Sequence, residues 1–174
     1  MPRTKADISN TAVRIFLQQV GKRYDDLRGM PRYAGTKAQK QEILEYFDDE
    51  CCYCGVHVGL QNLNQDHLIP MNKQSLGLHA WGNVVPACSK CNSKKQQKDW
   101  ESYLSACWPD DEKSAASRRA KLLQFMEYYK YEPNVELSAV AGNLYEDVGE
   151  VALTLINLRF KQAEAMLELI HTMG

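Results

Sequence analysis

Two Cys-x-x-Cys pairs constrain the fold of this 174-residue chain more than any other feature. Cys51 and Cys54 form the first pair, and Cys88 and Cys91 form the second. Two intervening residues let both sulfurs of a tight turn converge on one ion, so four such thiolates suit tetrahedral zinc. The spacer, residues 55–87, has 33 residues, whereas a simple zinc ribbon has about 15–20. We therefore expect a structural Zn²⁺ site that encloses an insertion, and we expect the chemistry to lie there.

The other cysteines leave alternatives open. Cys52 lies inside the first pair and could replace Cys51 as a ligand, although the regular spacing favours Cys51. Cys107 is isolated and is expected to be a free thiol in the core. No apolar leader or membrane-length run occurs, which predicts a cytoplasmic protein. Thiols stay reduced there, so six cysteines favour metal binding over disulfides. The competing interpretation is four unrelated buried cysteines.

Composition and charge indicate that any anion-binding surface is confined to one part of the chain. Apolar residues make up 44% of the chain and charged residues 25%, which is ordinary for a globular protein. The formal net charge is −1, so the chain as a whole is not a basic nucleic-acid-binding protein. However, residues 51–100 carry five Lys and two Asp, and residues 131–174 carry seven acids and two basic residues. A basic centre thus precedes an acidic C-terminal region.

Helical patterns lie on both sides of the central segment. Apolar spacing predicts an amphipathic helix over residues 8–24, with Asn10 or Thr11 as its cap. Thr36 and Gln39 resemble a capping box that opens a helix through about Phe47. The segment 51–99 is irregular and rich in Gly, Asn and Pro, so something other than apolar burial should hold it together.

Three more helices are predicted after the central segment. One begins at Trp100 and breaks near 108–110, and the next runs from a Ser114 cap to about residue 131, where Pro133 ends it. Its apolar side is expected to contain Leu122, Leu123, Phe125, Met126 and Tyr129. The last helix is expected over about 137–171, with an apolar stripe of Leu144, Val148, Val151, Leu155, Leu158, Ala163, Leu167 and Ile170. This stripe would serve either homodimerisation or completion of the core.

The insertion contains two motifs, 64-NQDHLIPM-71 and 81-WGNVVPACSKCN-92. Asp66-His67 before two aliphatic residues and Pro is typical of a short strand that ends at a functional pair. GNVVPAC predicts a second short strand that enters the second cysteine pair, and CNSKK then begins a helix. Taken singly, the Asp-His pair would be an ordinary surface pair, Asn83 a turn residue and Asn92 a helix cap.

In their order, CxxCG, DHLIP, GNVVPACSKCN and the lysine that follows resemble the HNH endonucleases of the ββα-metal fold. The resemblance covers about residues 51–95. It implies an α+β, mainly helical protein in which a small ββα-metal HNH core, held by a four-cysteine zinc site, is flanked by N-terminal and C-terminal helices. We divide the chain into an N-terminal helical region (1–50), a nuclease core (51–100) and a C-terminal helical region (101–174).

The resemblance also implies roles for single residues. The His-Asn-His trio that gives the family its name would be His67, Asn83 and Asn92. Asparagine in the third place departs from the literal name, but it resembles a variant that occurs within the family. His67 would be the general base that activates water. Asp66 and Asn92 would hold one Mg²⁺ or Mn²⁺ ion through oxygen ligands. Asn83 would hydrogen-bond backbone across the loop and keep His67 aimed.

The expected function is metal-dependent hydrolysis of DNA phosphodiester bonds, in restriction, phage defence or a mobile element. Four lysines within or after the second cysteine pair are candidates for contacts to DNA phosphates: Lys90, Lys94, Lys95 and Lys98. The alternative is that they form an ordinary solvated helix face. The rival hypothesis is a non-catalytic zinc module that binds nucleic acid or protein, which Asp66 and His67 argue against. A homodimer or a partner subunit could form through the C-terminal helices. His79 is expected to be a structural loop residue, the alternative being a contact to DNA.

Overall fold

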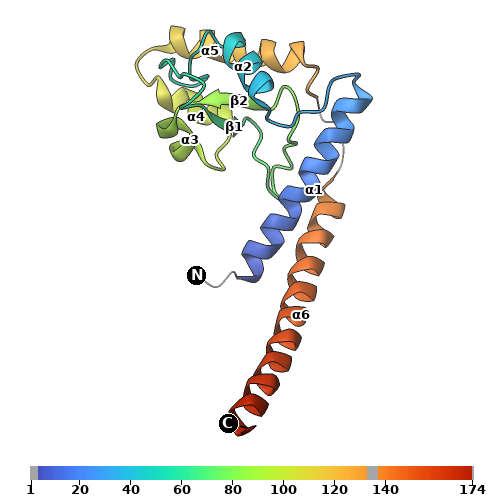
Figure 1. Cartoon of the computed structure of the whole chain (residues 1–174). Coiled ribbons are helices and arrows are strands. Elements are labelled where there is room, and N and C mark those ends of the chain that lie inside the picture. The colour runs from blue at the N-terminus through green and yellow to red at the C-terminus, as the bar shows by residue number, and fades with distance from the viewer. Residues whose placement is uncertain (1–3, 133–136, 174) are drawn as a thin grey trace.

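The computed structural model describes residues 4–132 and 137–173, and only the backbone of Ala139 and of residues 167–173. Its described elements are helices and two short strands, so the protein is α+β and mainly helical, as predicted. In chain order they are α1 (Lys5–Leu27), α2 (Lys37–Tyr46), β1 (Asn64–His67), β2 (Val84–Ala87), α3 (Ser89–Lys95), α4 (Trp100–Cys107), α5 (Glu112–Tyr128) and α6 (Ser138–Met173). The upper part of Figure 1 gathers the elements from α2 to α5 around the strands, and α1 and α6 extend away from them.

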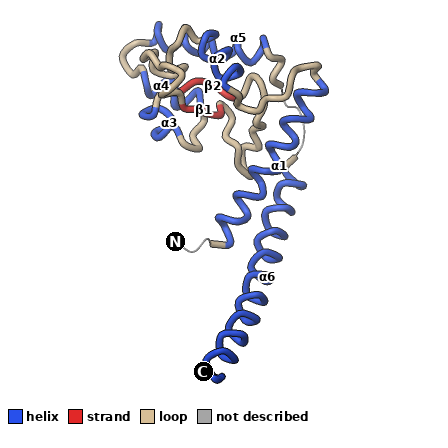
Figure 2. Tube along the Cα trace, in the orientation of Figure 1, coloured by secondary structure: helices blue, strands red, loops and turns tan. Residues whose placement is uncertain are grey.

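The strands form a two-stranded antiparallel sheet in which Asp66 pairs with Val85 and His67 with Val84. Figure 2 shows this small sheet with α3 close to it. Every residue of β2 is buried, which agrees with the apolar sequence of that strand. Two strands of four residues are too short to be stable alone, so the surrounding helices and the cysteine cluster must support them.

Helix α1 begins earlier than predicted. The Thr4 hydroxyl accepts a hydrogen bond from the Asp7 backbone N–H, and the Asp7 carboxylate accepts one from the Thr4 N–H. This capping box satisfies backbone donors that would otherwise be exposed at the helix start. The prediction of Asn10 or Thr11 as cap was therefore wrong, because the apolar stripe begins after the first turn of the helix.

The predicted start of α2 is confirmed. Thr36 is its N-cap and exchanges hydrogen bonds with Gln39 as a capping box. Ile43, Leu44 and Phe47 are buried in the main core. That core also takes residues from the strands, α4 and α5, so it draws on all three predicted regions of the chain. The division at residues 50 and 100 stays a prediction.

The break between α4 and α5 is confirmed at Trp108-Pro109-Asp110, but the cap of α5 is not Ser114. Asp111 caps the helix by accepting a hydrogen bond from the Ser114 N–H. On the predicted apolar side, Leu122, Phe125 and Tyr129 are buried and Met126 is half-buried, whereas Leu123 is exposed. Pro133, the predicted end of this helix, lies outside the described residues.

A second, smaller core joins α1 to the segment before β2. Val13 and Leu17 of α1 pack there with Leu78, Ala80 and other buried apolar residues. Gly21 makes the closest approach, since a Cβ atom at this position would lie 2.5 Å from the His79 carbonyl oxygen. The absence of a side chain at residue 21 thus lets α1 contact the backbone of His79 directly.

Helix α6 runs antiparallel to α1 and continues beyond the N-terminal end of that helix (Figure 1). Near residue 150 the two helices are joined by an ion pair between Lys5 and Glu150. Of the predicted stripe, Leu144 and Val148 are half-buried, but Val151, Leu155 and Leu158 are at least 50% exposed. The predicted completion of the core thus applies only to the part of α6 before about residue 150. The side chains of Leu167 and Ile170 lie outside the described residues.

Among the described residues, no helix is both long enough and apolar enough to span a membrane.

Candidate active site and metal centre

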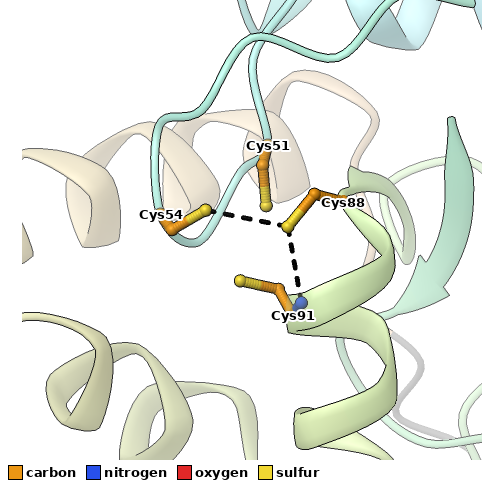
Figure 3. Close-up of side chains that lie close together, drawn as sticks. All are labelled: Cys51, Cys54, Cys88 and Cys91. Atoms are coloured by element: carbon orange, nitrogen blue, oxygen red, sulfur yellow. Dashed lines mark hydrogen bonds between the residues drawn. The ribbon is translucent and has the colours of Figure 1, made fainter. Parts of the chain in front are cut away.

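Four cysteine sulfurs lie together where the loop after α2 meets the start of α3 (Figure 3). The Sγ atoms of Cys51, Cys54, Cys88 and Cys91 all lie within 4.8 Å of one another, and those of Cys54 and Cys88 are 3.8 Å apart. Zn–S bonds of about 2.3 Å in a tetrahedron place sulfurs about 3.8 Å apart. The donor set and the spacing therefore fit one zinc ion. Cys52 and Cys107 are not in this cluster.

Local backbone structure explains how each pair converges. The first pair sits in a tight turn in which the Gly55 N–H donates to the Cys51 carbonyl oxygen. Gly55 has φ +72°, a left-handed conformation that favours glycine. In the second pair, Cys88 is the N-cap of α3, and its sulfur accepts from the Cys91 N–H at 3.4 Å. The Cys52 N–H donates to the Pro86 carbonyl oxygen and ties the first turn to β2.

Two of these thiols, Cys51 and Cys91, do not ionise readily without a nearby cation. Burial raises the pKa of Cys51 to about 11, and the nearby Cys54 adds to this. Burial and the neighbouring sulfurs raise the pKa of Cys91 still further. A metal ion would supply the missing positive charge and displace the thiol protons.

Asp66 of β1 and Lys95 of α3 form a buried ion pair. The Lys95 ammonium lies 3.1 Å from Asp66 Oδ2 and donates to the His67 carbonyl oxygen at 2.7 Å. The Tyr53 hydroxyl donates to the same Asp66 oxygen at 2.6 Å. The Lys95 side chain has no exposed surface. The structure thus corrects the expectation that Lys95 faces a DNA phosphate, because its charge is used inside the protein.

One cleft of about 350 Å³ brings the acid, the histidine and the asparagine together. Asp66 and His67 of β1 line it with Asn92 and Gln96, and Arg14 reaches it from α1. The sequence predicted that Asn92 begins α3, but Asn92 lies one turn inside the helix. Its N–H donates to the Cys88 carbonyl oxygen. The cysteine N-cap starts the helix early enough to turn Asn92 toward the cleft.

His67 has a partner that sequence reasoning missed. Its Nε2 atom lies 3.0 Å from Nδ1 of His79, and Tyr33 packs edge-on against the His79 ring. Burial lowers the pKa of His67 to about 3, and His79, Arg14 and Lys95 act in the same direction. Burial also lowers the pKa of His79. Both rings are therefore neutral near pH 7. No residue spacing pointed to this pair, because His79 reaches His67 only through the packing of its loop on α1.

Asn83 is fully buried in the loop before β2. Its side-chain oxygen accepts from the Ile69 N–H at 2.8 Å, and its amide nitrogen donates to the carbonyl oxygens of Ile69 and Leu78. Its backbone carbonyl accepts from the Leu68 N–H. These bonds hold the chain directly after His67 against the loop that carries His79.

Lys90, Lys94 and Lys98 are exposed and line a separate groove of about 850 Å³, the lysine groove. This groove also contains Cys54 and Cys91, so it lies beside the cysteine cluster. It meets the cleft of Asp66 and His67 at Gln96, which lines both spaces. None of the described residues that line the lysine groove is acidic.

The central segment of the chain is similar to a known protein family. Residues 51–103 match the family model described as HNH endonuclease. The chain contains an HNH endonuclease domain. It is 25% identical over 109 residues to the "SPbeta prophage-derived putative HNH endonuclease YoqL" of Bacillus subtilis (strain 168). That alignment covers 56% of this chain and 44% of the relative, so the chain spans less than half the length of that protein. The helices α1, α2, α5 and α6 lie outside the matched HNH segment.

Zinc binding can be tested by elemental analysis of the purified protein. We expect about one zinc per chain and almost none in the double variant Cys88→Ser/Cys91→Ser, since a serine hydroxyl is a far weaker zinc ligand than a thiolate. The midpoint temperature of thermal unfolding should be much lower in the same variant, because metal binding to such a site contributes to the free energy of folding. Cys107→Ser, which removes a thiol outside the cluster, should keep the zinc. A wild-type protein without zinc, even after refolding with Zn²⁺, would contradict the assignment.

Proposed function

We propose that the protein is a metal-dependent endonuclease that hydrolyses DNA phosphodiester bonds. The observation that carries this proposal is the single cleft lined by Asp66, His67 and Asn92 within the HNH domain. A neutral imidazole beside two hard oxygen ligands is the combination that such hydrolysis needs.

The donor atoms at the cleft fit one Mg²⁺ or Mn²⁺ ion. Both contacts that the described residues make with the Asp66 carboxylate use Oδ2, which leaves Oδ1 for a cation. Within the described part of the chain, no hydrogen bond engages the Asn92 side chain. Carboxylate and amide oxygens are ligands that these ions prefer. When bound, the ion would polarise the scissile phosphate and stabilise the leaving 3′ oxygen.

His67 is proposed as the general base. If its Nε2–H donates to His79, its Nδ1 lone pair is free to take a proton from water; the opposite arrangement would leave Nδ1 protonated. His79 would thus be a positioning residue that selects the ring orientation and the tautomer of His67. Asn83 would keep the backbone after His67 in place. Attack by the activated water on phosphorus would give 5′-phosphate and 3′-hydroxyl ends, as the resemblance implies.

Lys90, Lys94 and Lys98 are proposed to contact phosphates of the bound DNA. Their exposure, and the lack of acidic side chains among the described residues of their groove, support this role. Lys95 is proposed to act only through Asp66 and His67.

The biological setting is proposed from the relative. The relative is described as prophage-derived, which favours a mobile element over restriction or phage defence. A cytoplasmic location stays a prediction.

A homodimer through α6 is also proposed. The part of α6 beyond α1 is apolar around much of its circumference, with Leu155, Ile156, Leu158, Phe160 and Met166 all at least 50% exposed. A helix that is apolar on several faces requires a partner. Arg159 and Glu164 are five residues apart, the spacing at which opposite charges meet between parallel coiled-coil helices. Since they lie on the same exposed segment, a second copy would supply both the apolar surface and the complementary charge.

Plasmid cleavage tests the nuclease. Wild-type protein with Mg²⁺ or Mn²⁺ should cut DNA, and His67→Ala should reduce the rate at least about 100-fold, the usual contribution of a general base. Asn92→Ala should lower activity in a way that higher metal concentration partly restores. His57→Ala, at an exposed histidine in the same domain, is the control and should cut normally. No cleavage by wild type with any divalent metal would favour the non-catalytic zinc module instead.

The positioning role of His79 can be separated from a merely structural one by comparing two substitutions. His79→Phe keeps an aromatic ring against Tyr33 but removes the hydrogen bond to His67, so kcat should fall about 10- to 100-fold with little change in KM. His79→Asn can return an amide oxygen near the position of Nδ1 and should recover part of the lost kcat. Both variants should melt within a few degrees of wild type. Equal activity of the Phe and Asn variants would refute the role.

The dimer can be tested by sedimentation equilibrium. Wild type should have twice the chain mass of 19.9 kDa, and Ile156→Glu/Phe160→Glu should have the monomer mass, because two carboxylates would enter an apolar interface. Leu123→Glu, at an exposed leucine of α5, should remain dimeric. Monomeric wild type at every concentration tested would disprove the dimer.

A further inference from the structure

A second groove, the α1 groove, leads away from the catalytic cleft along α1. It has a volume of about 670 Å³ and is enclosed by α1, the segment 71–75 and Tyr145 of α6. Arg14, Met71 and Gln97 line both this groove and the catalytic cleft, so the two spaces adjoin. The lysine groove adjoins the same cleft at Gln96, so the catalytic cleft shares lining residues with both grooves.

The α1 groove is cationic and rich in amides. Arg14 and Lys73 are its charged side chains, and none of the described residues that line it is acidic. Its other polar residues include several amides that can donate to phosphate oxygens: Asn10, Asn72, Gln74 and Gln97. Such a lining is complementary to a phosphodiester backbone and offers nothing that would repel it.

Neither cation is neutralised by a carboxylate of the described residues. Among the ion pairs of the described residues, none involves Arg14 or Lys73. The Lys73 ammonium lies 3.7 Å from the centre of the Tyr145 ring, a cation–π contact that orients the side chain without removing its charge. Arg14 is exposed and lines the catalytic cleft together with Asp66 and His67.

Helix α1 is firmly attached beside the cleft. Gly21 packs on the His79 backbone, and Val13 and Leu17, on either side of Arg14 in sequence, are buried in the second core. Arg14 is thus presented by a supported helix rather than by a loop, which suits a residue that positions a substrate.

We propose that the α1 groove binds the DNA backbone next to the cleavage point, with Arg14 on the phosphate adjacent to the scissile one and Lys73 on a phosphate farther along. The inference rests on the proposed nuclease function and adds a substrate-binding residue, Arg14, from outside the segment that matches the HNH family. The strand would run from the lysine groove through the catalytic cleft and into the α1 groove. Arg14 can also engage two phosphate oxygens at once through its planar guanidinium.

Equilibrium DNA binding tests the groove without cleavage. In a His67→Ala background, fluorescence anisotropy with a labelled duplex should show about tenfold weaker binding for Arg14→Gln and for Lys73→Gln at low salt. Each loss should also reduce the slope of log K against log salt by about one, the value for one phosphate contact. Arg23→Gln is the matched control. Residue 23 is exposed on the same helix, and nine residues at about 100° each place it on the opposite face. It should leave affinity and slope unchanged.

Cleavage by the same variants with His67 intact separates the possible failures. Arg14→Gln should raise KM for DNA, and Arg23→Gln should not. If wild type binds and cuts DNA but Arg14→Gln and Lys73→Gln behave like Arg23→Gln, the groove proposal is overturned and the nuclease proposal stands. If wild type neither binds nor cuts DNA, the nuclease proposal fails and the groove proposal fails with it.

Discussion

The convergence of four cysteine sulfurs on one point is the constraint on which the rest of the HNH segment depends. The core has a two-stranded sheet with four residues in each strand and a seven-residue helix, too little for stability by hydrogen bonding alone. The cysteine cluster joins the turn at 51–54 to the first turn of α3. Because Cys88 is also the N-cap, the same residue that completes the cluster determines where α3 starts. The start of α3 in turn determines that Asn92 lines the cleft and that Lys95 reaches Asp66.

Lys95 then connects α3 to β1. A buried ammonium is costly unless it is paired and hydrogen-bonded, and here it has the Asp66 carboxylate and the His67 carbonyl oxygen as partners. This arrangement occupies Oδ2 of Asp66 and leaves Oδ1 for the proposed cation. The ion pair thus orients the proposed metal ligand and the backbone of the proposed base together. Its contribution lies in geometry more than in stability, since buried pairs often gain little net free energy.

The local motifs could be predicted from the sequence, whereas the contacts between distant segments could not. The two cysteine pairs and the cap at Thr36 depend on short spacings, which do not change with the packing of distant segments. The roles of Asp66, His67, Asn83 and Asn92 were implied by the resemblance of their motifs to the HNH family. The Lys95 error was avoidable, because Lys90 and Lys94 are four residues apart on one helix face and Lys95 is turned about 100° away from Lys94. His79 and Arg14 carried no such signal. Their positions depend on how α1 packs against the loop before β2, through Gly21 and the second core.

The segments outside the family match therefore do more than cover the core. The HNH segment supplies the acid, the histidines and the asparagines, but it lies at 51–103 and does not contain α1. Arg14 and the contact that fixes His79 come from α1. Helix α6 packs along α1 up to about residue 150, whereas its side chains at 154–166 are exposed. If α6 pairs with a second copy, the two nuclease cores are joined through the same helix that supports α1. The distance and direction between the two proposed cleavage sites would then depend on α6. Binding of the DNA strand at each site would depend on α1.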